Sequence, residues 1–167
     1  MMRTLKAPLA FAAAAALWAT AFAAGQSRNP EDLGVGKLLV SSRDIGDPSF
    51  AHSVILLTQY DQHGAVGLMI NRRTQAAISR VLKDVDTAKR GSDPVYIGGP
   101  VELDAVLALL RSKKKPDEAT SVLDEVYLAS TKPALEKALA ASLGSSDLRV
   151  YLGYCGWGGG QLENEVR

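Results

Sequence analysis

The chain is poor in the residues that build disulfides and metal sites. It has a single cysteine, Cys155, so no disulfide can form within the chain and the core alone must stabilise the fold. Its two histidines, His52 and His63, have no cysteine or carboxylate partner at a metal-ligand spacing. We therefore predict no metal ion and no cofactor, and we interpret Cys155 as a small buried core residue. A nucleophilic Cys155–His52 pair is the alternative, which would need the two side chains within hydrogen-bond reach.

A strong net charge is also lacking, because 19 basic side chains stand against 18 acidic ones. Such a balance gives no electrostatic footprint of a nucleic-acid-binding protein. Hydrophobic residues make up 47% of the chain and charged residues 22%, which is typical of a globular protein and too apolar for a disordered one. At 167 residues the composition indicates one domain with a core large enough to fold without covalent links.

The N-terminus has the layout of a secretory signal. Arg3 and Lys6 precede an apolar run, and the small residues Ala21-Phe22-Ala23 follow it. This order predicts a signal peptide over 1–23, cleaved near Ala23, and a mature protein that is periplasmic or secreted. The run is shorter than the roughly 20 residues of a membrane-spanning helix, so no stable membrane span is expected after cleavage. An uncleaved anchor or a misassigned start site are the alternatives, and the second would leave the protein cytoplasmic.

Residues 24–35 are polar and rich in turn formers, which predicts a flexible leader before a domain over 36–167. Within that domain, hydrophobic patterns predict strands at 37–42, 53–60, 65–71, 94–97, 123–130 and 148–155, the second and third joined by a hairpin turn. The apolar spacing predicts helices from Thr74 to about Gly91, over 102–112, and from Ser130 or Thr131 to Gly144, with a short helix at the end. This order favours an α+β fold over strict βαβ alternation.

The chain closes on "LRVYLGYCGWGGGQLENEVR", in which a strand meets a cluster of glycines. A P-loop would need lysine and a hydroxyl residue where Gln161 and Leu162 stand. A dinucleotide-binding loop would need a further glycine at 161 and an acidic residue about twenty positions on. A nucleophile elbow would need glycine at Trp157. Two interpretations stay open: a structural corner with Trp157 covering the core, and an anion site formed by free backbone N–H groups of Gly156–Gly160.

The turn Asn71-Arg72-Arg73-Thr74 follows a strand that is expected to be central in the sheet. Two arginines at the end of such a strand could hold a carboxylate or a phosphate, whereas a capped turn with solvated arginines is the plainer interpretation. No catalytic set is identified. The ligand-binding candidates are Asn71, Arg72, Arg73, Thr74, Gly98, Gly99, Trp157, Gly158 and Gln161.

Several motifs occur together in one order along almost all of the chain from Gly36 to Val166. They are Asp47-Pro48-x-Phe50, Gly64-x-x-Gly67 with Asn71, Gly98-Gly99-Pro100, and Gly153-Tyr154 followed by Trp157 and Gly160-Gln161-Leu162-Glu163. In these motifs the chain resembles the YqgE/AlgH family of bacterial proteins. The resemblance implies a single α+β domain with a mixed, curved sheet and flanking helices. Some members are labelled transcriptional regulators, and the resemblance brings no catalytic residues with it.

Two departures from the family's pattern affect the functional expectation. Members mostly lack an export signal, and they usually continue beyond the "QLENE" segment, so the domain is expected to be C-terminally short. A protein that leaves the cytoplasm cannot contact the chromosome directly, so nucleic acid is an unexpected partner. A short C-terminus would leave a sheet edge exposed, through which the chain could associate with itself.

Three functional hypotheses follow, and the missing catalytic set favours a protein that is not an enzyme. The first is a non-enzymatic binding or regulatory protein that acts on an unknown small molecule or protein. The second is a small-molecule or anion-binding protein, or an enzyme, that uses the Asn71–Thr74 turn and the Gly156–Gly160 loop. The third is an interaction scaffold that docks another chain along an exposed edge.

Overall fold

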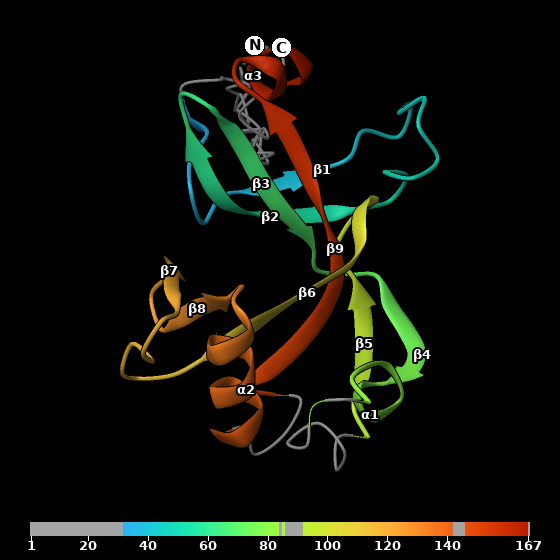
Figure 1. Cartoon of the computed structure of the whole chain (residues 1–167). Coiled ribbons are helices and arrows are strands. Elements are labelled where there is room, and N and C mark those ends of the chain that lie inside the picture. The colour runs from blue at the N-terminus through green and yellow to red at the C-terminus, as the bar shows by residue number, and fades with distance from the viewer. Residues whose placement is uncertain (1–31, 84, 86–91, 142–145, 167) are drawn as a thin grey trace, which may run out of the picture.

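A computed structural model of the chain describes residues 32–166 apart from residues 84, 86–91 and 142–145. The predicted signal peptide, most of the predicted leader and the expected helix ends at Gly91 and Gly144 lie outside the described residues. The described elements form the expected α+β fold (Figure 1). They are β1 (Leu38–Val40), β2 (Val54–Asp61), β3 (Gly64–Met69), β4 (Arg73–Ala77), α1 (Ile78–Val81), β5 (Pro94–Ile97), β6 (Val101–Arg111), β7 (Thr120–Leu123), β8 (Val126–Ala129), α2 (Lys132–Ala141), β9 (Leu148–Gly158) and α3 (Gln161–Glu165).

The strands form one mixed sheet that is organised around β9. Its main path runs β1-β2-β3-β9-β6-β8-β7, and β5 pairs with both β9 and β4 beside that path. The first residues of β9 pair antiparallel with β6 and its last residues pair antiparallel with β3. β5 runs parallel to β9, with Tyr96 opposite Tyr151. Figure 1 shows β9 running through both halves of the curved sheet, with β1, β2, β3 and α3 in one half and the remaining elements in the other.

Glycines allow the chain segments to approach closely where the two halves meet. A Cβ atom on Gly99 would lie 2.1 Å from the carbonyl carbon of Tyr154, and one on Gly98 would lie 2.3 Å from the carbonyl oxygen of Gly153. Gly153 itself has a φ of 68°, in the left-handed region that favours glycine. The N–H of Met69 donates to the carbonyl of Gly98 at 2.8 Å, which ties β3 to the connection between β5 and β6.

Three apolar clusters hold the layers together. In the first, α1 and α2 pack on the sheet through residues such as Ile78 and Leu135, which meet Val150 of β9. In the second, Leu162 of α3 packs with Trp157. The third joins the two halves of the sheet and comprises Leu56, Leu68, Leu107, Val122, Leu128 and Tyr151. Successive residues of β9, such as Val150 and Tyr151, therefore belong to different clusters, because side chains along a strand point alternately to its two faces.

The prediction of a helix over 102–112 is wrong, because this stretch is strand β6. Its apolar residues fit a helical spacing, but the run from Ala105 to Leu110 is apolar almost throughout. β6 lies between β8 and β9, and both of its faces are covered from Val106 to Leu110, with Ala108 in the first cluster and Leu107 in the third. A strand that is buried on both faces has a continuous apolar run, which periodicity cannot distinguish from a helix.

The expected helix from Thr74 is also largely wrong. Residues Arg73–Ala77 form β4, and only the four residues of α1 that follow are helical in the described part of this stretch. The hydroxyl of Thr74 donates to the carbonyl of Val95 at 2.8 Å and accepts from the N–H of Ala76 at 3.1 Å. Thr74 therefore binds the neighbouring strand instead of capping a helix, in keeping with the preference of β-branched residues for strands.

Two further expectations need correction. The strand expected over 123–130 is confirmed only from Val126, as β8, because the chain turns at Asp124-Glu125 to pair β8 with β7, and Glu125 there has a φ of 57°. The glycine corner expected over 156–160 is shorter, because β9 continues to Gly158, which pairs with Gly64. The turn into α3 is made by the next two residues, and Gly160 there has a φ of 75°.

Two predictions are confirmed closely: the hairpin over 53–71, which is formed by β2 and β3, and the helix that begins after Thr131, which is α2. Among the described residues, no helix has both the length and the apolar character needed to cross a membrane.

Candidate functional site

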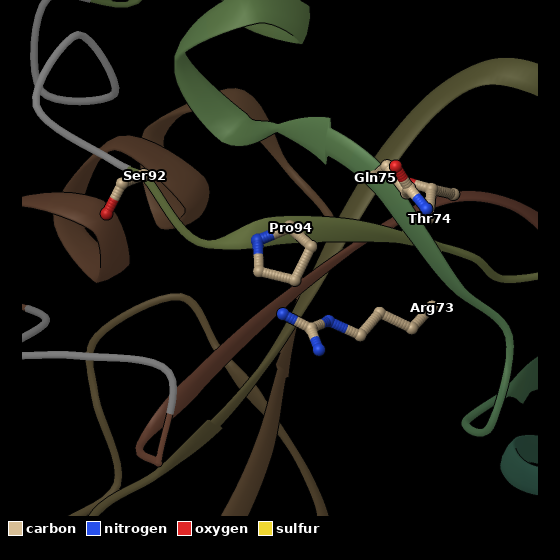
Figure 2. Close-up of a pocket in the computed structure, with 5 residues that line it drawn as sticks. All are labelled: Arg73, Thr74, Gln75, Ser92 and Pro94. Carbon is tan, nitrogen blue, oxygen red and sulfur yellow. The ribbon is translucent and has the colours of Figure 1, made fainter.

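An open hollow of about 460 Å³ lies between β4 and the start of β5. It is lined by Arg73, Thr74, Gln75, Ser92 and Pro94. Figure 2 shows the extended side chain of Arg73 reaching from β4 towards Pro94 on β5. The Arg73 side chain is exposed, and none of the salt bridges among the described residues involves it. Of the described residues that line the hollow, Arg73 is the one that carries a charge, and its guanidinium is open to solvent.

The pairing of β4 with β5 explains how these residues come together. Arg73 lies opposite Tyr96 and Ala77 lies opposite Pro94, with an irregularity in the register between the two pairs. Thr74 points its hydroxyl at the backbone of β5, so its hydrogen-bonding capacity is largely used within the protein. Since side chains alternate along a strand, Arg73 and Gln75 point to the opposite face and stay available.

The other two residues of the predicted Asn71–Thr74 turn serve the fold. The side-chain oxygen of Asn71 accepts from the N–H of Val54 at 3.0 Å, and its amide nitrogen donates to the carbonyl of His52 at 2.8 Å. The guanidinium of Arg72 donates to the carbonyl of Ala51 at 2.9 Å. Asn71 and Arg72 thus hold the segment that leads into β2, and the predicted pair of arginines does not form a clamp.

Gly98 and Gly99 are both buried, and atoms of β9 occupy the space that their side chains would fill. Close packing of backbone on backbone accounts for both glycines.

The glycine-rich end of β9 is fastened to α3 by its own polar groups. The N–H of Gly158 donates to Oε1 of Gln161 at 3.1 Å. The indole N–H of Trp157 donates to Oε2 of Glu165 at 2.8 Å, and Nε2 of Gln161 donates to Oε1 of the same carboxylate at 2.8 Å. The ring of Trp157 is buried in the second apolar cluster. The side chain of Gln161 therefore already accepts the hydrogen bond from the Gly158 N–H that an anion at this loop would need.

The two regions named in the second hypothesis do not meet. Figure 1 shows α3 in one half of the sheet and the β4–β5 pair in the other half. A ligand in the hollow could not also contact the Gly156–Gly160 loop.

The cysteine is placed as predicted, in the core. Cys155 is fully buried, and its Sγ lies 3.5 Å from the carbonyl oxygen of Gly98. Burial raises the pKa of the thiol to about 12, against the opposing effects of the Arg72 charge and a backbone hydrogen bond from Met69. His52, its hypothetical partner, is exposed. Within the described residues, no group of three or more histidine, cysteine, aspartate or glutamate side chains is arranged to hold a metal ion.

Gln75, Ser92 and Pro94 line the hollow but were not among the predicted site residues. The expected helix from Thr74 concealed them, because it placed residue 75 on a helix and left Ser92 in a connecting loop. The available signal was Thr74, a β-branched residue of the kind that is enriched in strands.

Comparison with known proteins supports the assignment that the motifs suggest. The AlgH-like family model matches residues 38–167. A UPF0301 protein of Thioalkalivibrio sulfidiphilus is 35% identical over 133 residues, which cover 78% of this chain and 71% of that protein. A UPF0301 protein of Streptomyces avermitilis is 37% identical over 136 residues, which cover 78% of this chain and 69% of that protein.

Two solved structures have a similar fold. The solution structure of the AlgH protein from Pseudomonas aeruginosa matches with a TM-score of 0.61 and 30% identity, over 77% of this chain and 69% of that chain. A crystal structure of a Corynebacterium diphtheriae protein matches with a TM-score of 0.66 and 21% identity, over 81% of this chain and 72% of that chain. On these matches the chain belongs to the AlgH-like family, as its motifs predicted.

Proposed function

We propose that this chain is a non-enzymatic binding protein and that its ligand carries a phosphate or carboxylate group, which Arg73 binds in the β4–β5 hollow. The observation that carries the proposal is the exposed Arg73 guanidinium at the edge of a hollow of about 460 Å³. That volume is in the range of small-molecule sites, which are roughly 300–1,000 Å³. A guanidinium presents paired N–H groups that match the oxygens of an anion, and it stays charged at any physiological pH.

The state of the reactive side chains supports a binding role over a catalytic one. A thiol with a pKa near 12 stays protonated at neutral pH, and the thiolate is the nucleophilic form. Cys155 is buried in a different part of the fold from the hollow. Among the described residues that line the hollow there is no carboxylate, histidine or cysteine that could transfer a proton or attack a substrate.

A thermal-shift screen of the full chain against phosphate, carboxylate and phosphorylated metabolites tests this proposal. A ligand at one hundred times its dissociation constant should stabilise the fold by roughly 2.7 kcal/mol, which raises the melting temperature by several degrees. Arg73→Gln should remove the shift, whereas Arg43→Gln, which changes an exposed arginine in the connection between β1 and β2, should preserve it. The proposal is contradicted if no anion stabilises the chain, or if Arg73→Gln responds like the unmodified protein.

Self-association through an open sheet edge is a second candidate function. β1 pairs only with β2, and β7 pairs only with β8, so each has one unpaired side within the described structure. Leu38 and Val40 of β1 are 57% and 53% exposed, and Leu123 of β7 is 46% exposed. Apolar side chains along a free edge favour pairing with a second copy of the chain. Light scattering should then report a dimer, and Leu38→Lys should make it monomeric without lowering the melting temperature.

We also propose that the protein is exported. The three-part order of residues 1–23 supports this, and the export would separate the protein from chromosomal DNA. N-terminal sequencing of the native protein from separated cell fractions tests it. A mature N-terminus near residue 24 in the periplasm or medium is the expected result, and an intact Met1 in the cytoplasm would contradict it.

A further inference from the structure

The strand register places a second arginine, Arg149 of β9, on the same face of the sheet as Pro94, which lines the hollow. In the parallel pairing of β5 with β9, Tyr96 is opposite Tyr151. Continuing that register by two residues places Arg149 opposite Pro94, which lines the hollow. Side chains two residues apart share a face of a strand, so Arg149 and Tyr151 point to the same side as Tyr96 and Pro94.

Arg73 reaches that face from the other side of β5. It is the cross-strand partner of Tyr96 in the antiparallel pair of β4 and β5, and directly opposed residues of such a pair project on the same face. The three strands lie in the order β4-β5-β9. Because neighbouring strands are about 4.8 Å apart, the backbones that carry Arg73 and Arg149 are about 10 Å apart, with β5 between them.

The Arg149 side chain is held in place by aromatic rings. Its guanidinium carbon lies 5.4 Å from the centre of the Tyr96 ring, within the range of a cation–π contact. The Tyr96 ring in turn packs on the buried ring of Tyr151, with centroids 5.5 Å apart and an interplanar angle of 41°. Within the described residues, Arg149 has no acidic side chain in salt-bridge range, and its interactions are the cation–π contact with Tyr96 and a side-chain hydrogen bond with Tyr151.

From this juxtaposition we infer that Arg73 and Arg149 form one site for a ligand with two linked phosphate groups, with Tyr96 positioning Arg149. The inference deepens the proposed function and rests on it. Each guanidinium can bind one phosphate through two N–H groups. A single phosphate group could contact one arginine at a time, whereas a diphosphate has oxygens at both ends and could contact both. The ligand class is therefore the diphosphates, including the diphosphate part of a larger molecule.

Isothermal titration of the full chain with pyrophosphate and with orthophosphate tests the inference. Pyrophosphate should bind more tightly than orthophosphate, and Arg73→Gln and Arg149→Gln should each weaken pyrophosphate binding about ten- to one-hundredfold, the loss expected for a charged hydrogen-bonded contact. Arg149→Gln should weaken orthophosphate binding much less. Arg43→Gln is the matched control for the loss of one positive charge and should leave both affinities unchanged.

Variants of Tyr96 separate the positioning role from the charge. Tyr96→Phe keeps the ring under Arg149 and should bind pyrophosphate like the unmodified protein. Tyr96→Leu removes the ring and should weaken pyrophosphate binding while leaving the weaker, Arg73-dependent orthophosphate binding unchanged. Circular dichroism of each variant checks that the fold is retained.

The possible failures are distinct. If neither phosphate nor pyrophosphate binds, or if Arg73→Gln has no effect, the proposed anion site is wrong and this inference falls with it. If both anions bind through Arg73 and Arg149→Gln leaves the preference for pyrophosphate intact, the anion site stands and the two-arginine site is wrong.

Discussion

The indole N–H of Trp157 donates a hydrogen bond of 2.8 Å to Oε2 of Glu165, and this bond joins the end of β9 to the last residue of α3. The same carboxylate accepts a bond from Gln161, and Tyr60 of β2 donates to Glu163 at 2.7 Å. A helix of five residues is too short to be stable alone. Its position on the sheet therefore depends on these bonds and on the buried Leu162.

Glu165→Ala removes the acceptor for both Trp157 and Gln161, and it should lower the free energy of unfolding by about 1 kcal/mol. In a Trp18→Phe background Trp157 is the sole tryptophan, since the chain has two. Its fluorescence emission should shift to longer wavelength because the loosened helix admits water. Asn164→Ala, a change at an exposed neighbour in α3, is the control and should have no effect on either quantity. Equal emission and stability in the two variants would argue against this role of Glu165.

Gly99→Ala should destabilise the fold by about 3 kcal/mol or prevent folding, because the new methyl group would meet the backbone of Tyr154. Gly158→Ala is the matched comparison. Its nearest atom would be Oε1 of Gln161 at 3.9 Å, so the free energy of unfolding should change by less than about 0.5 kcal/mol. Urea unfolding of both variants measures the difference. If the order of the two effects were reversed, the assignment of Gly99 to backbone packing would be wrong.

Two buried acids predict a loss of stability at alkaline pH. Burial raises the pKa of Cys155 from its ordinary 9.0 to about 12, and burial likewise raises the pKa of Tyr151 from 10.0 to about 12, partly offset by Arg149. As the pH rises, the unfolded chain loses these protons first. The contribution of each group is therefore complete below its ordinary pKa and declines between that value and about pH 12.

Urea unfolding at intervals from pH 7 to pH 11 should show this decline. Cys155→Ala should have a lower free energy of unfolding at neutral pH but a shallower alkaline decline, because one of the two titrations is absent. A flat profile in the unmodified protein would show that these groups titrate alike in the folded and unfolded chains.

Local signals explain which elements could be predicted from the sequence. The β2–β3 hairpin has two β-rich runs around a polar turn. The helix α2 has a capping residue, and the N–H of Ala134 donates to the hydroxyl of Thr131 at 3.3 Å. Cys155 and Trp157 were expected in the core because they extend an apolar strand, and both are buried.

The identity of β6 and β4 depends on partners that are distant in the sequence. β6 pairs with β9, and Leu107 lies opposite Tyr151, which is 44 residues further along the chain. No window of the sequence around 102–112 contains that information, so the helical spacing of its apolar residues led to the prediction of a helix. The residues of the candidate site were also hard to predict, because long-range strand pairing brings them together. Arg73 could be predicted from its turn, but Ser92 and Pro94 meet it only through the pairing of β4 with β5, and Arg149 comes to the same face only through the pairing of β5 with β9.

The measurement that most directly tests the account is an NMR titration of the ¹⁵N-labelled full chain with pyrophosphate, following every assigned backbone amide. If the anion binds in the β4–β5 hollow, the largest shifts should occur at Arg73, Thr74, Gln75 and Ser92, while the amide signals of Gly156–Gly160 should not move. Shifts that centre on the Gly156–Gly160 loop and spare the hollow would contradict it, since the end of β9 would then bind the anion.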